Sequence, residues 1–439
     1  MFHLKQILLL SFLLPVALPA TLDWPQWRGP ERDGVWRETG LASELDKDSE
    51  GWIKLKWSVD IAAGYSQPTV ADGRVYVTDR LDDREEIERV HCFDFNTGKQ
   101  LWSYHYPVEY TVGYKSGPRA AVLIDEGRAY SLGGMGHLYC FDARSGEVIW
   151  KRDLATEYHI EMPRWGLAAS PLIEGGSLFL QIGGQPDACV VSLDKYTGKE
   201  LWRAIDDDAS YIAPIMIDQA GQRVLVVYTA DELFGLNPNT GNAYWSFAMP
   251  GSQWPIGIST PVLTTYQGKR YIFTTNAHVG SALLLLKEDM PEISKVWYRN
   301  DKRTADNIHS LIPTPYIKDG YIYGTHQKGE LRCLELLTGK QVWESTEAVE
   351  PDRFATLHIV AEGDDGQPVW IFNEHGELII AELSPKAYKQ ISRGKLVRST
   401  AAGMPARIGG VAWAHPAFAY KHVIARNDEK LVCADLSAR

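Results

Sequence analysis

A unit of eleven residues recurs along this chain and limits the folds that it can adopt. In the copy at 140–150, an apolar run ends at Asp142, Ser145-Gly146 marks a turn, and a second apolar run ends at Trp150. The polar residue lies eight places before the tryptophan, and the glycine lies four places before it. Recurrence at a fixed period indicates a repeat architecture, in which each unit packs against its neighbours. The other copies with this spacing are Asp94, Gly98 and Trp102; Asp194, Gly198 and Trp202; Asn237, Gly241 and Trp245; and Glu335, Gly339 and Trp343.

A second marker, a proline followed by a strand, a turn and another strand, accompanies these units. Turn signals such as Asp72-Gly73 and Glu126-Gly127 lie between the two strands. Proline cannot donate a ladder hydrogen bond, which favours an edge position such as the innermost strand of a propeller blade. The marker prolines are Pro68, Pro118, Pro171, Pro214, Pro261, Pro315 and Pro416.

Each unit is therefore predicted to hold four short strands in about 47 residues. We expect an all-β protein, an eight-bladed β-propeller of four-stranded antiparallel blades. The unit that ends at Trp297 lacks the Thr-Gly turn, and the unit from about Phe354 to Gln390 has lost both proline and tryptophan. A seven-bladed ring with one irregular insertion is the alternative.

The two ends of the chain carry complementary parts of one unit. Leu55–Trp57 matches the end of a unit, and Leu431–Leu436 matches the beginning of one. Pairing of these N- and C-terminal strands would close the ring and hide both sheet edges. We assign the propeller to residues 52–439.

The N-terminal 51 residues do not follow the repeat. Residues 1–20 have the pattern of a secretory signal, with Lys5 before an apolar run and Ala20 as a candidate cleavage point. The run is too short to span a bilayer, so we expect a periplasmic or secreted protein without a transmembrane segment. Residues 21–51 contain Trp24, Trp27 and Trp36 without strand alternation. We expect them to form an aromatic arm that lies on the ring, because these indoles would not stay in water.

Charge and cysteine content exclude two other interpretations. The net charge of −11 argues against a nucleic-acid partner, which requires a basic face. The cysteines at repeat positions are a whole blade apart, too far for disulfides, and are expected to be small buried apolar residues. These are Cys92, Cys140, Cys333 and Cys433, whereas Cys189 lies off the register.

The unit Phe141-Asp142-x-x-Ser145-Gly146-x-x-Ile149-Trp150 resembles the tryptophan-docking repeat of the PQQ-like (pyrroloquinoline-quinone repeat) β-propeller family. The resemblance implies an exported bacterial propeller of one of two kinds. One kind is the quinoprotein alcohol dehydrogenases, which hold PQQ and calcium at the ring axis. The other is non-catalytic, such as the propeller lipoprotein of the outer-membrane β-barrel assembly machinery. This chain has no pair of adjacent cysteines, a mark of the alcohol dehydrogenases.

Unusual residues gather on one predicted face of the ring, formed by the loops between blades and between the second and third strands. Nine histidines and many aromatic residues fall there, which indicates a binding surface at the channel mouth. We expect no metal site, and no residues specify PQQ or calcium. The candidate binding residues are Arg119, His137, Arg164, Trp165, His309, His326, Trp413 and His415.

Two functions follow from this pattern. The first is a non-catalytic propeller, expected to be monomeric, that binds a protein, peptide or glycan partner on its histidine-rich aromatic face. The second is a PQQ-dependent oxidoreductase with its site at the same channel mouth.

Overall fold

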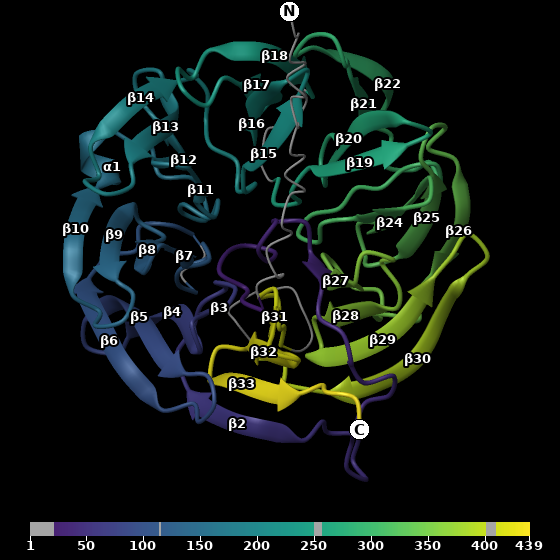
Figure 1. Ribbon diagram of the computed structural model, residues 1–439, viewed down its shortest axis with the longest axis horizontal. Helices are drawn as coiled ribbons and strands as arrows, with labels where there is room; N and C mark the ends of the chain where they lie inside the picture. Colours follow the sequence, from purple (N-terminus) through teal and green to yellow (C-terminus); the bar gives the residue numbers. More distant parts are fainter. Residues whose placement is uncertain (1–21, 114–115, 250–256, 401–409) are drawn as a thin grey trace, which may run out of the picture.

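The computed structural model describes residues 22–113, 116–249, 257–400 and 410–439, which form a ring of eight sheets around a central axis (Figure 1). This confirms the eight-bladed propeller and rules out the seven-bladed alternative. The predicted signal, residues 1–20, lies outside the described residues. No described helix has the length and apolarity needed to cross a membrane.

The first four blades follow the chain, each from its innermost to its outermost strand. Blade 1 holds β3 (Thr69–Ala71), β4 (Arg74–Asp82), β5 (Glu86–Asp94) and β6 (Gln100–Pro107). Blade 2 holds β7 (Leu123–Asp125), β8 (Arg128–Leu132), β9 (His137–Asp142) and β10 (Val148–Asp153), followed by the short helix α1 (Leu154–Glu157). Blade 3 holds β11 (Leu172–Glu174), β12 (Ser177–Gly184), β13 (Ala188–Asp194) and β14 (Glu200–Ala204). Blade 4 holds β15 (Ile215–Gln219), β16 (Gln222–Tyr228), β17 (Glu232–Leu236) and β18 (Ala243–Ala248).

The remaining blades complete the circle. Blade 5 holds β19 (Val262–Tyr266), β20 (Lys269–Asn276), β21 (Gly280–Leu286) and β22 (Ile293–Arg299). Blade 6 holds β23 (Tyr316–Lys318), β24 (Tyr321–Thr325), β25 (Leu331–Glu335) and β26 (Gln341–Ser345). Blade 7 holds β27 (Leu357–Glu362), β28 (Val369–Asn373), β29 (Glu377–Leu383) and β30 (Tyr388–Lys395). Blade 8 holds β31 (Ala417–Ala419), β32 (His422–Arg426), β33 (Lys430–Asp435) and, from the other end of the chain, β2 (Leu55–Asp60).

Blade 8 closes the ring as predicted. The outer strand β2 pairs antiparallel with β33, with Trp57 opposite Cys433. The N-terminal half of the chain therefore supplies the last strand of a sheet begun at the C-terminus, and neither end leaves an open blade.

The repeated residues join neighbouring blades. The indole Nε1 of Trp150 donates to the carbonyl of Lys195 in blade 3 at 3.1 Å. Gly198 has a φ of +71°, and a Cβ placed there would lie 2.8 Å from the Trp150 ring. The glycine is thus needed both for the turn and for the close approach of the indole. Asp142 accepts hydrogen bonds from the backbone N–H groups of Arg144 and Ser145, which fixes its turn.

Blade 5 lacks the Thr-Gly turn, and a side chain replaces the missing contact. Trp245 donates to Oε1 of Gln219 at 2.9 Å instead of to a backbone carbonyl. The amide of Gln219 then donates to the carbonyls of Lys287 and Glu292 in blade 5. One glutamine therefore joins the tryptophan of blade 4 to the degenerate turn of blade 5.

All five cysteines are free and buried, as expected from the repeat. Four of them lie directly opposite a blade tryptophan on the neighbouring strand, where a small side chain fits against the indole. The pairs are Cys92 with Trp102, Cys140 with Trp150, Cys333 with Trp343, and Cys433 with Trp57.

The segment before β2 crosses the centre of the ring (Figure 1). Trp24 forms an antiparallel bridge with Val70 of blade 1. The short strand β1 (Val35–Trp36) then pairs parallel with β27 and makes blade 7 five-stranded. The repeat does not predict this fifth strand, because β1 lies outside the repeated units. Trp24 and Trp36 are 1% and 2% exposed, so both indoles are part of the core.

Candidate functional site

A pocket of about 150 Å³ lies at the mouth of the central channel, above the crossing segment. The loops that enter the eight blades build its wall, and every blade contributes at least one side chain. A site on the ring axis is the place where all the repeats can meet one ligand. This pocket is the candidate functional site.

Seven of the fifteen lining residues come from a single repeat position, four residues before the innermost strand, which we call the mouth layer. In blade 7 the pocket residue is Phe354, three places before β27. Blade 3 adds Trp165 and blade 6 adds Leu311. The mouth-layer residues that line the pocket are Tyr65, Arg119, Ala168, Tyr211, Ile258, Ile312 and Trp413.

The position two residues further along each loop forms a second, buried ring, which we call the base layer. Its members are small or polar, and they hold the crossing segment. Gln67 accepts a hydrogen bond from the backbone N–H of Arg28 at 3.0 Å, and Thr260 accepts one from Nε1 of Trp27 at 3.0 Å. Trp27 also packs edge-on against His415. Trp27 therefore closes the bottom of the pocket.

Two buried guanidinium groups anchor the crossing segment beneath the pocket. Arg32 donates to the carbonyls of Ser170 and Pro171 and to Oε1 of Gln26. Arg28 donates to the carbonyl of Asp33 at 2.9 Å. Burial lowers the pKa of Arg28 to about 10 and that of Arg32 to about 9. Both values keep the groups charged at neutral pH. Arg32 ties the segment to blade 3 through two carbonyls, whereas the Arg28 guanidinium braces the segment itself.

The pocket has two unlike halves. Blades 8 and 1 to 4 supply an aromatic half with one cation, in which Tyr65 packs against Trp413 and Trp165 packs against Tyr211 at ring-centroid distances of 6.0 and 5.3 Å. The Arg119 guanidinium lies 5.9 Å from the centre of the Tyr65 ring. Blades 5 to 7 supply an apolar half made of Ile258, Leu311, Ile312 and Phe354.

Two histidines line the pocket at its base. Nδ1 of His415 donates to the carbonyl of Pro416 at 2.7 Å, and Nε2 of His358 donates to the carbonyl of Trp413 at 2.9 Å. Burial lowers the pKa of His358 to about 4 and that of His415 well below its usual value, so both rings are neutral. A carbonyl can only accept, so the second nitrogen of each ring carries a lone pair. Both imidazoles therefore offer acceptors rather than positive charge.

Buried contacts hold the walls in place. Nε1 of Trp413 donates to the buried carboxylate of Glu374 at 3.0 Å, and the same oxygen accepts from the N–H of Thr356 at 3.1 Å. The hydroxyl of Tyr211 accepts from the backbone N–H of Trp165 at 3.2 Å. These bonds orient one aromatic pair on each side of Arg119.

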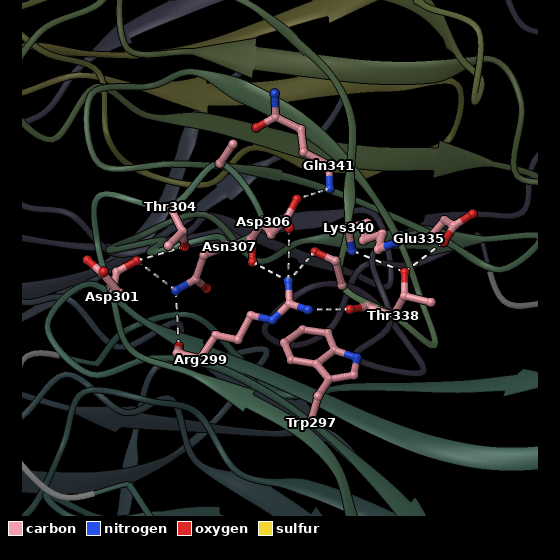
Figure 2. Close-up of polar contacts among 12 residues, drawn as sticks. Trp297, Arg299, Asp301, Thr304, Asp306, Asn307, Glu335, Thr338, Lys340 and Gln341 are labelled. Carbon is pink, nitrogen blue, oxygen red and sulfur yellow. Dashed lines mark hydrogen bonds and ion pairs between the residues drawn. The ribbon is translucent and has the colours of Figure 1, made fainter.

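The loop that carries Leu311 and Ile312 is fixed by a network between blades 5 and 6. Figure 2 shows Arg299 over the ring of Trp297, reaching toward the turn of the next blade. The guanidinium of Arg299 donates to the carbonyls of Asp306, Thr338 and Gly339. Asp306 in turn accepts from the N–H of Gln341 at 2.8 Å. The network ties the base of the loop to both blades.

The structure brings together four of the eight residues proposed from the sequence. Arg119, Trp165, Trp413 and His415 line the pocket, and Arg164 is the exposed neighbour of Trp165. The other three lie elsewhere. His137 begins β9 and packs against Tyr106 of blade 1, and His309 packs edge-on against His326 at blade 6. No group of three or more histidine, cysteine, aspartate or glutamate side chains suited to a metal occurs in the described ranges.

Sequence reasoning missed most of the mouth layer, although the signal was present. Tyr65, Tyr211, Ile258, Ile312 and Trp413 each lie three places before a marker proline. In blade 2 the marker is displaced, because Pro118 lies five places before β7, and Arg119 takes the equivalent position. Reading the residue at a fixed distance before each proline would have found the ring of side chains.

The pocket does not fit the PQQ and calcium pair of the alcohol dehydrogenases. Its described lining contains one guanidinium and no carboxylate. Calcium takes oxygen ligands, chiefly carboxylates and amides, and a quinone with several carboxylates needs more than one cation. Of the features that would hold such a quinone, the lining offers only the flat rings of Trp165 and Trp413, on which the quinone could stack.

Comparison with known proteins agrees with this architecture. A family model described as "Outer membrane protein assembly factor BamB" matches residues 44–122 and 86–345, more than half of the 439 residues. The chain belongs to this PQQ-like propeller family. The BamB of Nitrosomonas eutropha is 24% identical over 177 residues, which cover 40% of this chain and 38% of that protein. The match thus spans about two fifths of the curated relative.

Two solved structures show how widely the fold is shared. BamB from Moraxella catarrhalis superposes with a TM-score of 0.56 and 14% identity, covering 87% of this chain and 98% of that one. A quinohemoprotein alcohol dehydrogenase from Pseudomonas putida superposes with a TM-score of 0.67 and 13% identity, covering 95% of this chain and 80% of that one. At these identities the likeness concerns the fold alone.

Proposed function

We propose that this protein is an exported, non-catalytic propeller that binds a segment of a partner polypeptide in its channel-mouth pocket. The observation that carries the proposal is the pocket itself, which is apolar, lies on the axis and receives side chains from every blade. Membership of a family described as an outer-membrane assembly factor supports a polypeptide partner. The absence of carboxylates from the described lining weighs against calcium-dependent oxidation at this place.

A polypeptide fits this lining better than a glycan. Sugars need many hydrogen-bond partners, because unpaired hydroxyl groups are costly to bury. Here the wall consists mainly of tryptophan, tyrosine and aliphatic side chains, with Arg119, Ser170 and the two histidines as the polar groups. Aromatic anchors in a dry pocket are typical of the sites that dominate polypeptide binding.

The test uses fluorescence anisotropy of labelled peptides. An octapeptide with one central tryptophan and an otherwise polar sequence should bind, and its alanine counterpart should bind at least about tenfold more weakly. Trp165→Ala should reduce the affinity by a similar factor. Tyr196→Ala is the matched control, because Tyr196 is an exposed aromatic residue on a turn at the opposite face. Parallel titrations with cellotetraose and with PQQ plus calcium examine the other two ligand classes.

Binding of the peptide that is lost in Trp165→Ala and kept in Tyr196→Ala supports the proposal. Saturable binding of the oligosaccharide, or quinone-dependent dye reduction, without any peptide binding would overturn it.

A further inference from the structure

The size and the closed base of the pocket suit one aromatic side chain. Its volume is about 150 Å³, and an apolar cavity of about that size holds a ligand as large as benzene. Trp27 closes the bottom, where it donates to Thr260 and packs edge-on against His415. A polypeptide therefore cannot thread through the channel, and its backbone has to stay at the mouth while a single side chain enters.

The base of the pocket offers hydrogen-bond acceptors to that side chain. Nδ1 of His415 donates to the carbonyl of Pro416 at 2.7 Å, so Nε2 carries a lone pair, and no described residue donates to it. The ring of His358 lies 4.7 Å from that of His415, and its second nitrogen is also an acceptor. Both rings line the pocket, so a side chain that reaches the base meets acceptors.

The charge around the base excludes a cationic donor. Burial is the main cause of the low pKa of His358 and of His415, and the Arg28 guanidinium lowers both values further. A fixed positive charge therefore acts on the two rings. The described lining contains no carboxylate to offset it, so charge repulsion opposes the entry of a lysine or arginine side chain. The donor that fits this base is neutral.

Among neutral side chains, an indole matches a base of acceptors best. Tryptophan has one N–H and no acceptor, so a single hydrogen bond satisfies all of its polar atoms. A phenylalanine ring would leave the acceptor of His415 unpaired, which is costly once water is expelled. A tyrosine hydroxyl could donate to His415, but it would also bring an acceptor oxygen to a place where His358 and His415 are themselves acceptors.

We propose that the pocket recognises the side chain of a tryptophan within a partner polypeptide, with the indole between the two aromatic pairs and its N–H on Nε2 of His415. This inference rests on the proposed function and adds the identity of the bound residue. The aromatic walls bind any large ring. His415 is the residue that distinguishes tryptophan from other aromatic side chains.

The experiment compares octapeptides of one sequence, blocked at both ends, by isothermal titration calorimetry. The central residue is Trp, 3-benzothienylalanine, Tyr, Phe or Lys. Benzothienylalanine has nearly the shape of tryptophan but carries sulfur in place of the N–H. With the native protein, the Trp peptide should bind about fivefold more tightly than the benzothienylalanine peptide, because one hydrogen bond is lost. The Lys peptide should bind at least about tenfold more weakly than the Trp peptide.

A variant of the base assigns the acceptor. His415→Phe retains an aromatic ring against Trp27 and should bind the Trp and benzothienylalanine peptides equally well, because both partners of the hydrogen bond are then dispensable. Tyr196→Ala should keep the native preference. If His415→Phe does not fold, the comparison of the two peptides on the native protein still decides whether the N–H is recognised.

The possible results separate this inference from the proposed function. Equal binding of the Trp and benzothienylalanine peptides to the native protein, or a preference that survives in His415→Phe, overturns the contact with His415 and leaves polypeptide binding intact. A Tyr or Phe peptide that binds as tightly as the Trp peptide overturns the choice of the indole. If N-acetyltryptophanamide binds as tightly as the octapeptide, the assignment to a polypeptide is wrong. If no peptide binds, neither this inference nor the proposed function stands.

Discussion

Two positions of the same repeat behave in opposite ways. At the turn between the third and fourth strands, the glycine and the tryptophan that contacts it recur almost unchanged around the ring. At the mouth layer, the equivalent residue is Tyr, Arg, Ala, Ile or Trp, depending on the blade. Five of the turns make the same contact with the tryptophan of the preceding blade, so one solution serves all five. The mouth positions all face one shared space, and a ligand without eightfold symmetry needs different side chains there.

The contrast shows where information about function resides in such a chain. The constant residues specify the ring, and the variable residues specify what the ring holds. Substitutions at constant positions should therefore change stability, and substitutions at the mouth should change binding. The following experiments test that division, from the largest expected effect to the smallest.

Removing one docking tryptophan should have the largest effect on stability. Trp150→Ala deletes an indole that packs on Gly198 and donates to the carbonyl of Lys195. We expect the free energy of unfolding to fall by about 3–5 kcal/mol, as for other large-to-small changes in packed sites. Urea denaturation measures the change. Peptide affinity of the folded fraction should stay the same, and a large loss of affinity would contradict the division.

A smaller loss should follow from adding a single methyl group beside that indole. Gly198→Ala combines a positive φ of +71° with a Cβ only 2.8 Å from the Trp150 ring. Backbone strain contributes about 1–2 kcal/mol and overpacking about 1–3 kcal/mol. Gly221→Ala is the matched control, because its φ is +73° but nothing lies within 4 Å of the added Cβ. The difference between the two variants measures the docking contact, and equal losses would show that only the turn requires glycine.

As the pH falls, the stability that depends on the buried histidines of the pocket should be lost before the stability that depends on the turn carboxylates. Burial lowers the pKa of His358 to about 4, so the unfolded chain takes up a proton below about pH 6.5 that the folded chain does not. His358 therefore has no effect on the free energy of unfolding above pH 6.5. As the pH falls from 6.5 toward 4, the free energy of unfolding falls with it, by roughly 2 kcal/mol at pH 5. The turn carboxylates affect stability only at a lower pH. The Ser145 N–H holds the pKa of Asp142 below its usual value, so its contribution is lost only in stronger acid.

His358→Gln provides the test of this pH dependence. Glutamine can still donate to the carbonyl of Trp413 but does not titrate, so the fall in denaturation midpoint between pH 7 and pH 5 should become smaller. An unchanged pH slope would contradict the assignment of a neutral buried imidazole. Peptide binding should be nearly flat between pH 6.5 and pH 8, because burial holds the pKa of His415 well below its usual value.

The difference between the two regions also explains what could be predicted from the sequence. The ring, its closure through Trp57 and the free cysteines follow from spacing, because the same contact is repeated and each copy confirms the others. Strand β1 and the base of the pocket could not be predicted in this way. They depend on Trp27, Arg28 and Arg32, which occur once and find their partners in blades far away in sequence. His309 and His326 were predicted on the binding face but are paired at blade 6, since residue type alone does not reveal orientation.

The smallest effect should come from the joint between the arm and the ring. Trp27→Phe removes the hydrogen bond from Nε1 to Thr260 while retaining an aromatic ring against His415. We expect a loss of about 1 kcal/mol in the free energy of unfolding, the value of one neutral hydrogen bond. Thr260→Val removes the acceptor, and the double variant should lose little more than either single change, because both delete the same bond. Peptide affinity should change by less than about twofold in Trp27→Phe, because hydrogen bonds from Arg28 and Arg32 still hold the arm. A large loss of affinity in Trp27→Phe would mean that a bound peptide depends on the indole at the base of the pocket as well as on the mouth layer. Binding would then be determined by a residue outside the repeat, and not by the variable repeat positions alone.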